Sequence, residues 1–237
     1  MWGVGLPTTY LVMPRPTFIN DEFYHIYNRG VEKRKIFLSE EDYYRFVHDL
    51  YEFNDEDVTI NNFRIIKSKR SPKLRKLLVD IICWCLMPNH YHLLLRQLRE
   101  GGISKFLQKL GTGYTNYFNW KYKRSGVLFQ GKSKAVQIKT DTQLTHTSRY
   151  IHINSVELIE PNWKERGIKD WKKVKEFLNS YRWSSYPDYI GKDNFPSLIK
   201  KDFLLGYFND SEREYKKFVE EWVVGDVEII KELTLED

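Results

Sequence analysis

The chain has 237 residues, enough to bury a sizeable core without a disulfide or a structural metal, and its 16% aromatic content excludes a largely disordered protein. Its net charge of +6 indicates a nucleic-acid partner only where the basic residues are clustered. Its apolar stretches are far shorter than the roughly 20 residues that a membrane helix requires, and Pro7, Pro14 and Pro16 interrupt any secretory signal, so we expect a cytoplasmic protein.

Apolar periodicity and turn residues define the expected elements in chain order. Residues 1–20 lack periodicity and indicate an N-terminal arm. Ser39 is the expected N-cap of the first helix, and Asp141 or Thr142 is the expected cap of the third. The expected strands lie at 23–27, 80–87, 90–97 and 127–138, and the expected helices at 39–53, 103–122, 141–156, 200–207 and 211–223.

The order of these elements predicts an α+β fold. Strand, helix, strand, strand, helix and strand is the βαββαβ order of a ferredoxin-like core with an antiparallel sheet. We therefore expect the N-terminal arm at 1–20, a core domain at 21–160 and a C-terminal helical extension at 161–237 that packs on the core.

Basic residues gather in two stretches that contain no acid, 64–76 and 121–139. The second stretch also contains Tyr122 and Phe129. Cations bind a phosphate backbone and aromatic rings stack on unpaired bases, so this mixture is typical of single-strand nucleic-acid binding. A plain solvated surface is the alternative interpretation of each stretch.

The expected hairpin carries His90 and His92. Side chains two residues apart share one face of a strand, so the two imidazoles can bind one metal ion. By itself this spacing also fits two ordinary core or surface histidines. On the third expected helix, Tyr150 and Asn154 lie four residues apart and thus on one face, where a phenol and an amide oxygen point the same way.

Other side chains compete for a role in such a site. Tyr114 and Tyr117 are alternative nucleophiles, although aromatic residues at helical spacing usually belong to a core. His146 lies one turn before Tyr150 and is a candidate for assisting it, although its position favours a plain surface or capping role. His152 lies on a different face of that helix and indicates a structural or DNA-contacting role rather than a metal ligand.

Several motifs in one order resemble the IS200-like single-tyrosine transposases of the HUH class, and among them the REP-associated tyrosine transposases. The resemblance extends from about Tyr24 to Tyr189. The motifs that carry it are His25-Ile26-Tyr27-Asn28-Arg29-Gly30, Met87-Pro88-Asn89-His90-Tyr91-His92, Leu128-Phe129-Gln130-Gly131-Lys132-Ser133-Lys134, Arg149-Tyr150-Ile151-His152-Ile153-Asn154 and Trp183-Ser184-Ser185-Tyr186.

The resemblance implies a metal-dependent single-stranded DNA endonuclease and strand transferase that forms a 5′-phosphotyrosine intermediate. By position, Tyr150 matches the nucleophile, and His90, His92 and Asn154 match the ligands of a divalent ion, Mg²⁺ or Mn²⁺. The implied partner is single-stranded or hairpin DNA, bound by a monomer or a homodimer. The basic residues expected to contact DNA are Arg124, Lys132, Lys134, Arg149, Lys67, Lys69 and Arg70.

The sequence also departs from the family pattern. Ser155 stands where a proline is common, and Lys132 and Ser133 stand where arginine and an aromatic residue are usual. These departures concern target recognition rather than the chemistry. The alternative function is a catalytically silent module on the same fold that binds hairpin DNA or RNA; a metal hydrolase would need more carboxylates near the histidines.

Overall fold

The computed structural model describes residues 15–57 and 75–221. Within these residues, four strands form an antiparallel sheet in the order β2-β3-β1-β4. They are β1 (Phe23–Arg29), β2 (Val79–Met87), β3 (His90–Gln97) and β4 (Lys134–Ile138). With a helix after β1 and another after β3, this is the ferredoxin-like βαββαβ core that the element order predicts.

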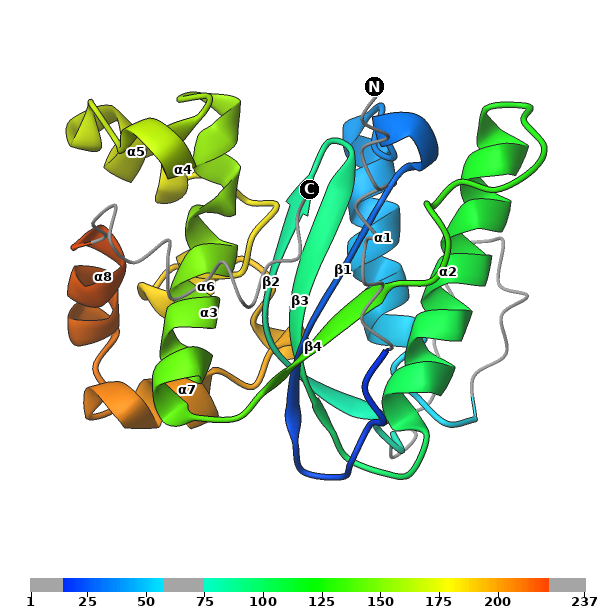
Figure 1. Cartoon of the computed structure of the whole chain (residues 1–237), viewed down its shortest axis with the longest axis horizontal. Helices are drawn as coiled ribbons and strands as arrows, with labels where there is room; N and C mark the ends of the chain where they lie inside the picture. The colour runs from blue at the N-terminus through cyan, green and yellow to red at the C-terminus, as the bar shows by residue number, and fades with distance from the viewer. Residues whose placement is uncertain (1–14, 58–74, 222–237) are drawn as a thin grey trace, which may run out of the picture.

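Helices α1 (Glu40–Glu52) and α2 (Gly102–Lys121) pack together over one face of the sheet (Figure 1). Ser39 caps α1 as predicted, in a capping box with Asp42. On this face the Tyr91 ring of β3 lies 5.1 Å from the Phe46 ring of α1, measured between centroids. Because side chains alternate along a strand, His90 and His92 face the other side of the sheet.

Helix α3 (Asp141–Ile153) covers that other face and continues as the 3-10 helix η2 (Asn154–Leu158). The predicted cap at Asp141 or Thr142 is wrong by one or two residues. Thr140 keeps an extended backbone, and its side chain accepts a hydrogen bond from the backbone amide of Gln143. The helix was expected to continue to 156; instead, it tightens at Asn154.

Strand β4 is much shorter than the predicted strand at 127–138. Phe129 forms only an isolated bridge with Gly30, and regular pairing with β1 begins at Lys134. Gly131 has a φ of +73°, which turns the chain away from the extended conformation that an alternating pattern would need. Residues 128–133 therefore form a loop beside β1 rather than a continuation of the sheet.

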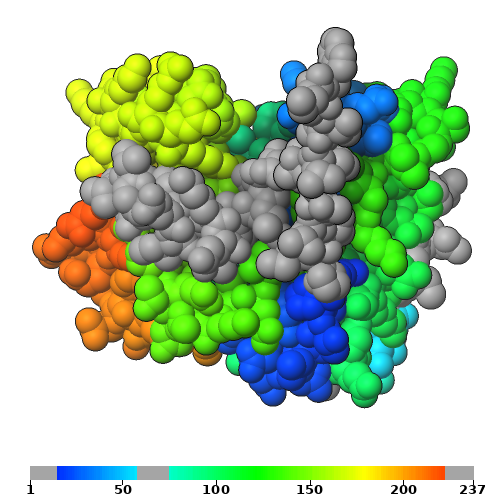
Figure 2. Space-filling view, viewed as in Figure 1, coloured from blue at the N-terminus to red at the C-terminus, as the bar shows by residue number. Residues whose placement is uncertain are grey.

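The C-terminal extension packs on the α3 side of the sheet, where its helices form the left side of the space-filling view (Figure 2). Trp183 and Ser185 bond to the backbone of β2, through Leu86 N to Trp183 O at 2.8 Å and Ser185 N to Trp84 O at 3.0 Å. This segment thereby covers the edge of the sheet. The helices are α4 (Trp163–Arg166), α5 (Trp171–Leu178), α6 (Tyr186–Tyr189), α7 (Lys201–Leu205) and α8 (Glu212–Glu220), with 3-10 helices η1 (Val31–Lys33), η3 (Pro196–Leu198) and η4 (Gly206–Phe208).

The sequence predicts α7 and α8 but not the three short helices before them, because four to eight residues carry too little periodicity. Among the helices of residues 15–57 and 75–221, none combines the length and apolar character that crossing a membrane requires.

Candidate active site

The sheet and α3 bring the predicted site residues together. His90 and His92 project from one face of β3, with ring centroids 5.1 Å apart. His90 Nε2 lies 3.1 Å from Asn154 Oδ1, at the end of α3. The ring centroid of Tyr150, one turn earlier, lies 5.7 Å from that of His92. Side chains more than fifty residues apart in the sequence thus converge within a single chain.

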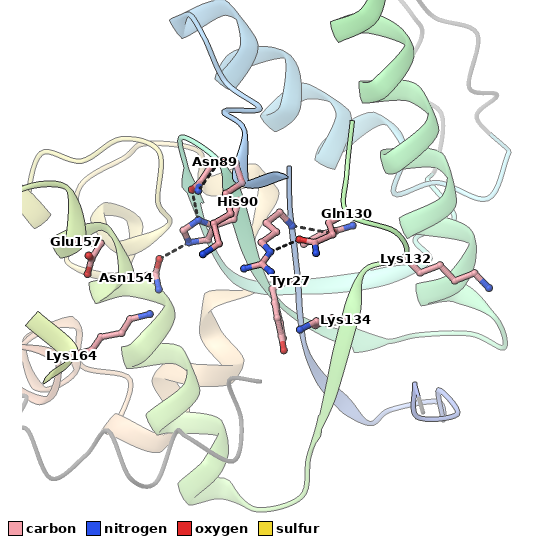
Figure 3. Close-up of a pocket in the computed structure, with 12 residues that line it drawn as sticks. Tyr27, Asn89, His90, Gln130, Lys132, Lys134, Asn154, Glu157 and Lys164 are labelled. Carbon is pink, nitrogen blue, oxygen red and sulfur yellow. Dashed lines mark hydrogen bonds between the residues drawn. The ribbon is translucent and has the colours of Figure 1, made fainter. Parts of the chain in front are cut away.

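The hydrogen bonds of His90 define which of its nitrogens can act as a ligand. Its Nδ1 lies 2.7 Å from Asn89 Oδ1, and a carbonyl oxygen can only accept, so Nδ1 carries the proton and donates it. The Asn89 amide is held in turn because its Nδ2 donates to the Lys33 carbonyl at 3.4 Å. In the neutral imidazole, Nε2 of His90 then has a lone pair, and it lies 3.1 Å from Asn154 Oδ1 (Figure 3).

His92 is oriented by a second histidine, His25 of β1. His25 Nε2 and His92 Nδ1 lie 2.9 Å apart, and both side chains are fully buried. When His92 Nδ1 donates this hydrogen bond, its Nε2 keeps the lone pair that a metal needs. The strand register alone does not show this contact, because Tyr27 and not His25 is paired with His92 across the sheet.

These atoms form a donor set that fits a divalent cation. Two imidazole nitrogens and one amide oxygen can hold it, and the facing lone pairs of His90 and Asn154 repel unless a cation or a proton lies between them. Within residues 15–57 and 75–221, no group of three His, Cys, Asp or Glu side chains could hold a metal ion.

Tyr150 is only 3% exposed and lies between the sheet and α4. Its ring stands edge-on to the rings of His92 and His25, with a centroid distance of 6.1 Å to the latter. Its hydroxyl accepts a hydrogen bond of 2.8 Å from Lys164 Nζ. The predicted nucleophile therefore contacts His25, His92 and Lys164.

A pocket opens beside these residues, and we call it the site pocket (Figure 3). Five of its lining side chains are basic and one, Glu157, is acidic, so the charge of the pocket favours the binding of an anion. Its lining residues are Tyr27, Asn28, Arg29, Lys33, Asn89, His90, Gln130, Lys132, Lys134, Asn154, Glu157 and Lys164.

The basic residues predicted to contact DNA fall into different places. Lys132 and Lys134 line the site pocket. Arg124 lies outside its lining and donates to Asn119 Oδ1 at 2.9 Å. Arg149 requires a correction: it is only 4% exposed, and its Nη1 donates to the Phe218 carbonyl at 3.1 Å, so it anchors α8 instead of facing a ligand. Lys67, Lys69 and Arg70 lie outside the described residues.

His146 and His152 are both engaged elsewhere. His146 Nδ1 accepts a hydrogen bond from Arg149 Nη2 at 3.0 Å, and its ring packs edge-on against Phe218. His152 bonds to Ser185 Oγ at 2.8 Å and to the Tyr215 hydroxyl at 2.7 Å, and burial lowers its pKa to about 3. These contacts give His152 a structural role and connect His146 to Arg149 and Phe218.

The two alternative nucleophiles lie on the opposite side of the sheet from the histidine pair. Tyr114 is fully buried and donates to the Ile36 carbonyl at 2.6 Å. Tyr117 donates to Asp42 Oδ1 at 3.0 Å. Burial raises the pKa of Tyr117 to about 12, which opposes formation of a phenolate. Both tyrosines are part of the packing of α1 and α2.

The solved structures that resemble this chain include two distant likenesses. One is to a REP-associated tyrosine transposase bound to a REP hairpin, with 16% identity, a TM-score of 0.48, and coverage of 77% of this chain and 87% of that one. The other is to a bacterial tRNA(His) guanylyltransferase-like protein in complex with ATP, with 8% identity, a TM-score of 0.37 and coverage of 71% of each chain. Neither is close enough to bear on function.

No curated protein matches the chain. The model of the IS200-like transposase family, however, matches residues 24–154, which is more than half of the chain. This range contains His90, His92, Tyr150 and Asn154. The chain belongs to the IS200-like transposase family.

Proposed function

We propose that the protein is a metal-dependent single-stranded DNA endonuclease and strand transferase in which Tyr150 is the nucleophile. The observation that carries this proposal is the contact of the Tyr150 ring with His92, 5.7 Å between centroids, beside the His90–Asn154 pair. A protein that only bound DNA would not need a phenol, two imidazoles and an amide oxygen in one place.

In the proposed reaction, the Tyr150 hydroxyl oxygen attacks the scissile phosphorus. A bond forms between this oxygen and phosphorus, and the bond from phosphorus to the 3′ oxygen breaks. The phenolic proton is lost to water and the leaving 3′ oxygen gains one, so the products are a 5′-phosphotyrosine and a free 3′-hydroxyl. The phosphodiester energy is kept in the protein-DNA bond, and a 3′-hydroxyl that attacks it rejoins the strand.

His90 Nε2, His92 Nε2 and Asn154 Oδ1 are the atoms proposed to hold a divalent ion. Mixed nitrogen and oxygen ligands suit Mg²⁺ or Mn²⁺ better than tetrahedral Zn²⁺. When bound, such an ion withdraws charge from the phosphate and fixes its orientation. Asn89 and His25 support the proposal, because they bond to the opposite nitrogens of the two rings.

The proposed substrate is single-stranded or hairpin DNA. Arg29, Lys33, Lys132 and Lys134 line the site pocket and supply positive charge around the proposed scissile phosphate. Arg124 and the stretch with Lys67, Lys69 and Arg70 are proposed as further phosphate contacts. Because His92, Asn154 and Tyr150 come from one chain, a monomer would contain the complete site.

A second function is favoured by one observation. Tyr150 is only 3% exposed, so a phosphate reaches its hydroxyl only after some movement around it. If this movement does not occur, the protein is a silent module that binds hairpin DNA or RNA. The two functions differ in one product, the covalent protein-DNA bond.

The test is to incubate the protein with a labelled single-stranded hairpin and Mn²⁺ and to resolve the products in denaturing gels. The proposal predicts a labelled adduct that survives boiling in detergent, disappears in Tyr150→Phe and persists in the control Tyr114→Phe. An adduct that persists in Tyr150→Phe would contradict the assignment of the nucleophile. Full DNA binding without an adduct, with Mn²⁺ or with Mg²⁺, would support the binding module instead.

A further inference from the structure

Lys164 reaches the site from the C-terminal extension, outside the residues 24–154 that match the family. Its position is fixed by its neighbours in α4. Trp163 is only 1% exposed, and the backbone amide of Asn162 donates to Glu157 Oε1 at 3.2 Å. Because these contacts attach α4 to the core and to η2, Lys164 projects from a defined turn toward α3.

The Lys164 ammonium group has two neighbours of functional interest. It donates a hydrogen bond of 2.8 Å to the Tyr150 hydroxyl, and it lies 4.8 Å from the centroid of the Tyr150 ring. Lys164 also lines the site pocket together with His90 and Asn154, whereas Tyr150 does not (Figure 3). One lysine thus contacts the phenolic oxygen and also lines the space that a phosphate would enter.

The ring and the hydroxyl of Tyr150 contact different chemical groups. Toward the sheet, the described contacts of its ring are the imidazoles of His25 and His92. Toward α4, the described contact of its hydroxyl is the Lys164 ammonium. A fixed cation at the reacting oxygen stabilises charge that develops during attack, and it can attract an anionic phosphate to the same point.

We propose that Lys164 is a catalytic cation of this site, which orients the Tyr150 oxygen before attack and binds a non-bridging oxygen of the scissile phosphate as the bond to phosphorus forms. This inference rests on the proposed function and extends it to the C-terminal extension. Lys164 donates hydrogen bonds and transfers no proton in this step, so the proton balance is unchanged: the phenol loses one proton to water and the 3′ oxygen gains one.

The experiment compares Lys164→Met, Lys164→Arg and the control Lys172→Met, an exposed lysine in α5. For each variant, the single-turnover rate of adduct formation and the affinity for the hairpin are measured with Mn²⁺. We expect Lys164→Met to slow adduct formation by about 10²- to 10³-fold, as loss of one charge-stabilising donor does elsewhere. Its DNA affinity should fall only a few-fold, because a single phosphate contact is lost.

Lys164→Arg should recover most of the rate, since a guanidinium can also donate to the Tyr150 oxygen and to a phosphate oxygen. Lys172→Met should match the wild type. Thermal melting of the variants checks that α4 remains folded. A wild-type or higher rate in Lys164→Met would overturn the inference, because the lysine would then only cover the hydroxyl. Absence of an adduct in the wild type would instead contradict the proposed function, and this inference with it.

Discussion

At the scale of single residues, the site depends on which ring nitrogen carries a proton. Asn89 accepts from His90 Nδ1, and His25 bonds to His92 Nδ1, so in both rings Nε2 is the nitrogen that remains for the proposed metal ion. Such partners of metal-binding histidines fix the tautomer and the ring orientation. The geometry thus separates residues that would bind a metal from residues that position them.

This separation gives a prediction for His25. Replacing it in His25→Phe keeps an aromatic ring but removes the partner of His92, and we expect the affinity for Mn²⁺ to fall by about 10- to 100-fold. His48→Phe is the control, because His48 lies on α1, across the sheet. A titration followed by the Mn²⁺ electron spin resonance signal measures the Mn²⁺ affinity of both variants. Equal affinities in His25→Phe and the wild type would contradict this role.

The sequence predicts some of these residues and not others, for physical reasons. His90 and His92 are visible because strand geometry places positions i and i+2 on one face, and Tyr150 and Asn154 because a helix places i and i+4 on one face. His25 and Lys164 have no such spacing, since their contacts depend on the packing of separate elements. Arg149 is basic and adjacent to Tyr150, but helix rotation turns it toward α8.

At the scale of elements, Asp42 connects α1 and α2, the two helices that cover the face of the sheet opposite His90 and His92. Its carboxylate accepts hydrogen bonds from Lys121 Nζ at 2.8 Å and from the Tyr122 hydroxyl at 2.7 Å, and it also caps the start of α1. Burial by itself would raise the pKa of Asp42, but the hydrogen bonds from Lys121, Tyr122 and the backbone amides of Leu38 and Ser39 outweigh it and lower the pKa.

We therefore expect Asp42→Asn to reduce the free energy of unfolding at pH 7 by about 3 to 5 kcal/mol, because it removes the buried carboxylate of the pair and leaves Lys121 only the exposed Glu41 carboxylate. The control Glu41→Gln removes a carboxylate that is 81% exposed and bound to the same lysine, and its effect should stay below about 1 kcal/mol. Urea unfolding measures both. Equal losses in the two variants would contradict the importance of burial at Asp42.

The same carboxylate predicts a pH dependence. Its folded pKa lies below the ordinary value of 3.8, so the unfolded chain binds a proton at pH values where the folded chain does not. The stabilisation is complete well above pH 4 and is lost as the pH falls through 4 toward the folded pKa. Asp42→Asn should accordingly lose less stability than the wild type between pH 6 and pH 3.

Elements with long periodic patterns are predictable from the sequence, and short ones are not. The β2-β3 hairpin and helices α1 and α2 agree with the prediction to within a few residues, because each buries a regular apolar face. Residues 127–133 alternate like a strand, yet Gly131 turns the chain there. In α4 the four residues Trp163–Arg166 carry no periodic signal, although they hold Lys164 in place.

At the scale of the whole molecule, β3, η2 and α4 of one chain meet at the site pocket, and Tyr150 lies on α3 directly before η2. This arrangement predicts that two inactive variants, His92→Ala and Tyr150→Phe, do not restore adduct formation when mixed, because neither chain contains a complete site. The His92→Ala and Tyr150→Phe double variant is the background control. An adduct that appears only in the mixture would show that the tyrosine and the histidine come from different subunits.

The central claim is tested most directly by identifying the side chain to which the DNA becomes covalently attached. The adduct formed with a hairpin and Mn²⁺ would be digested with protease and nuclease, and the peptide that carries the remaining nucleotide would be sequenced by mass spectrometry. We predict a 5′-phosphoryl group on Tyr150. The same group on Tyr114, Tyr117 or any other side chain, with Tyr150 unmodified, would contradict the account.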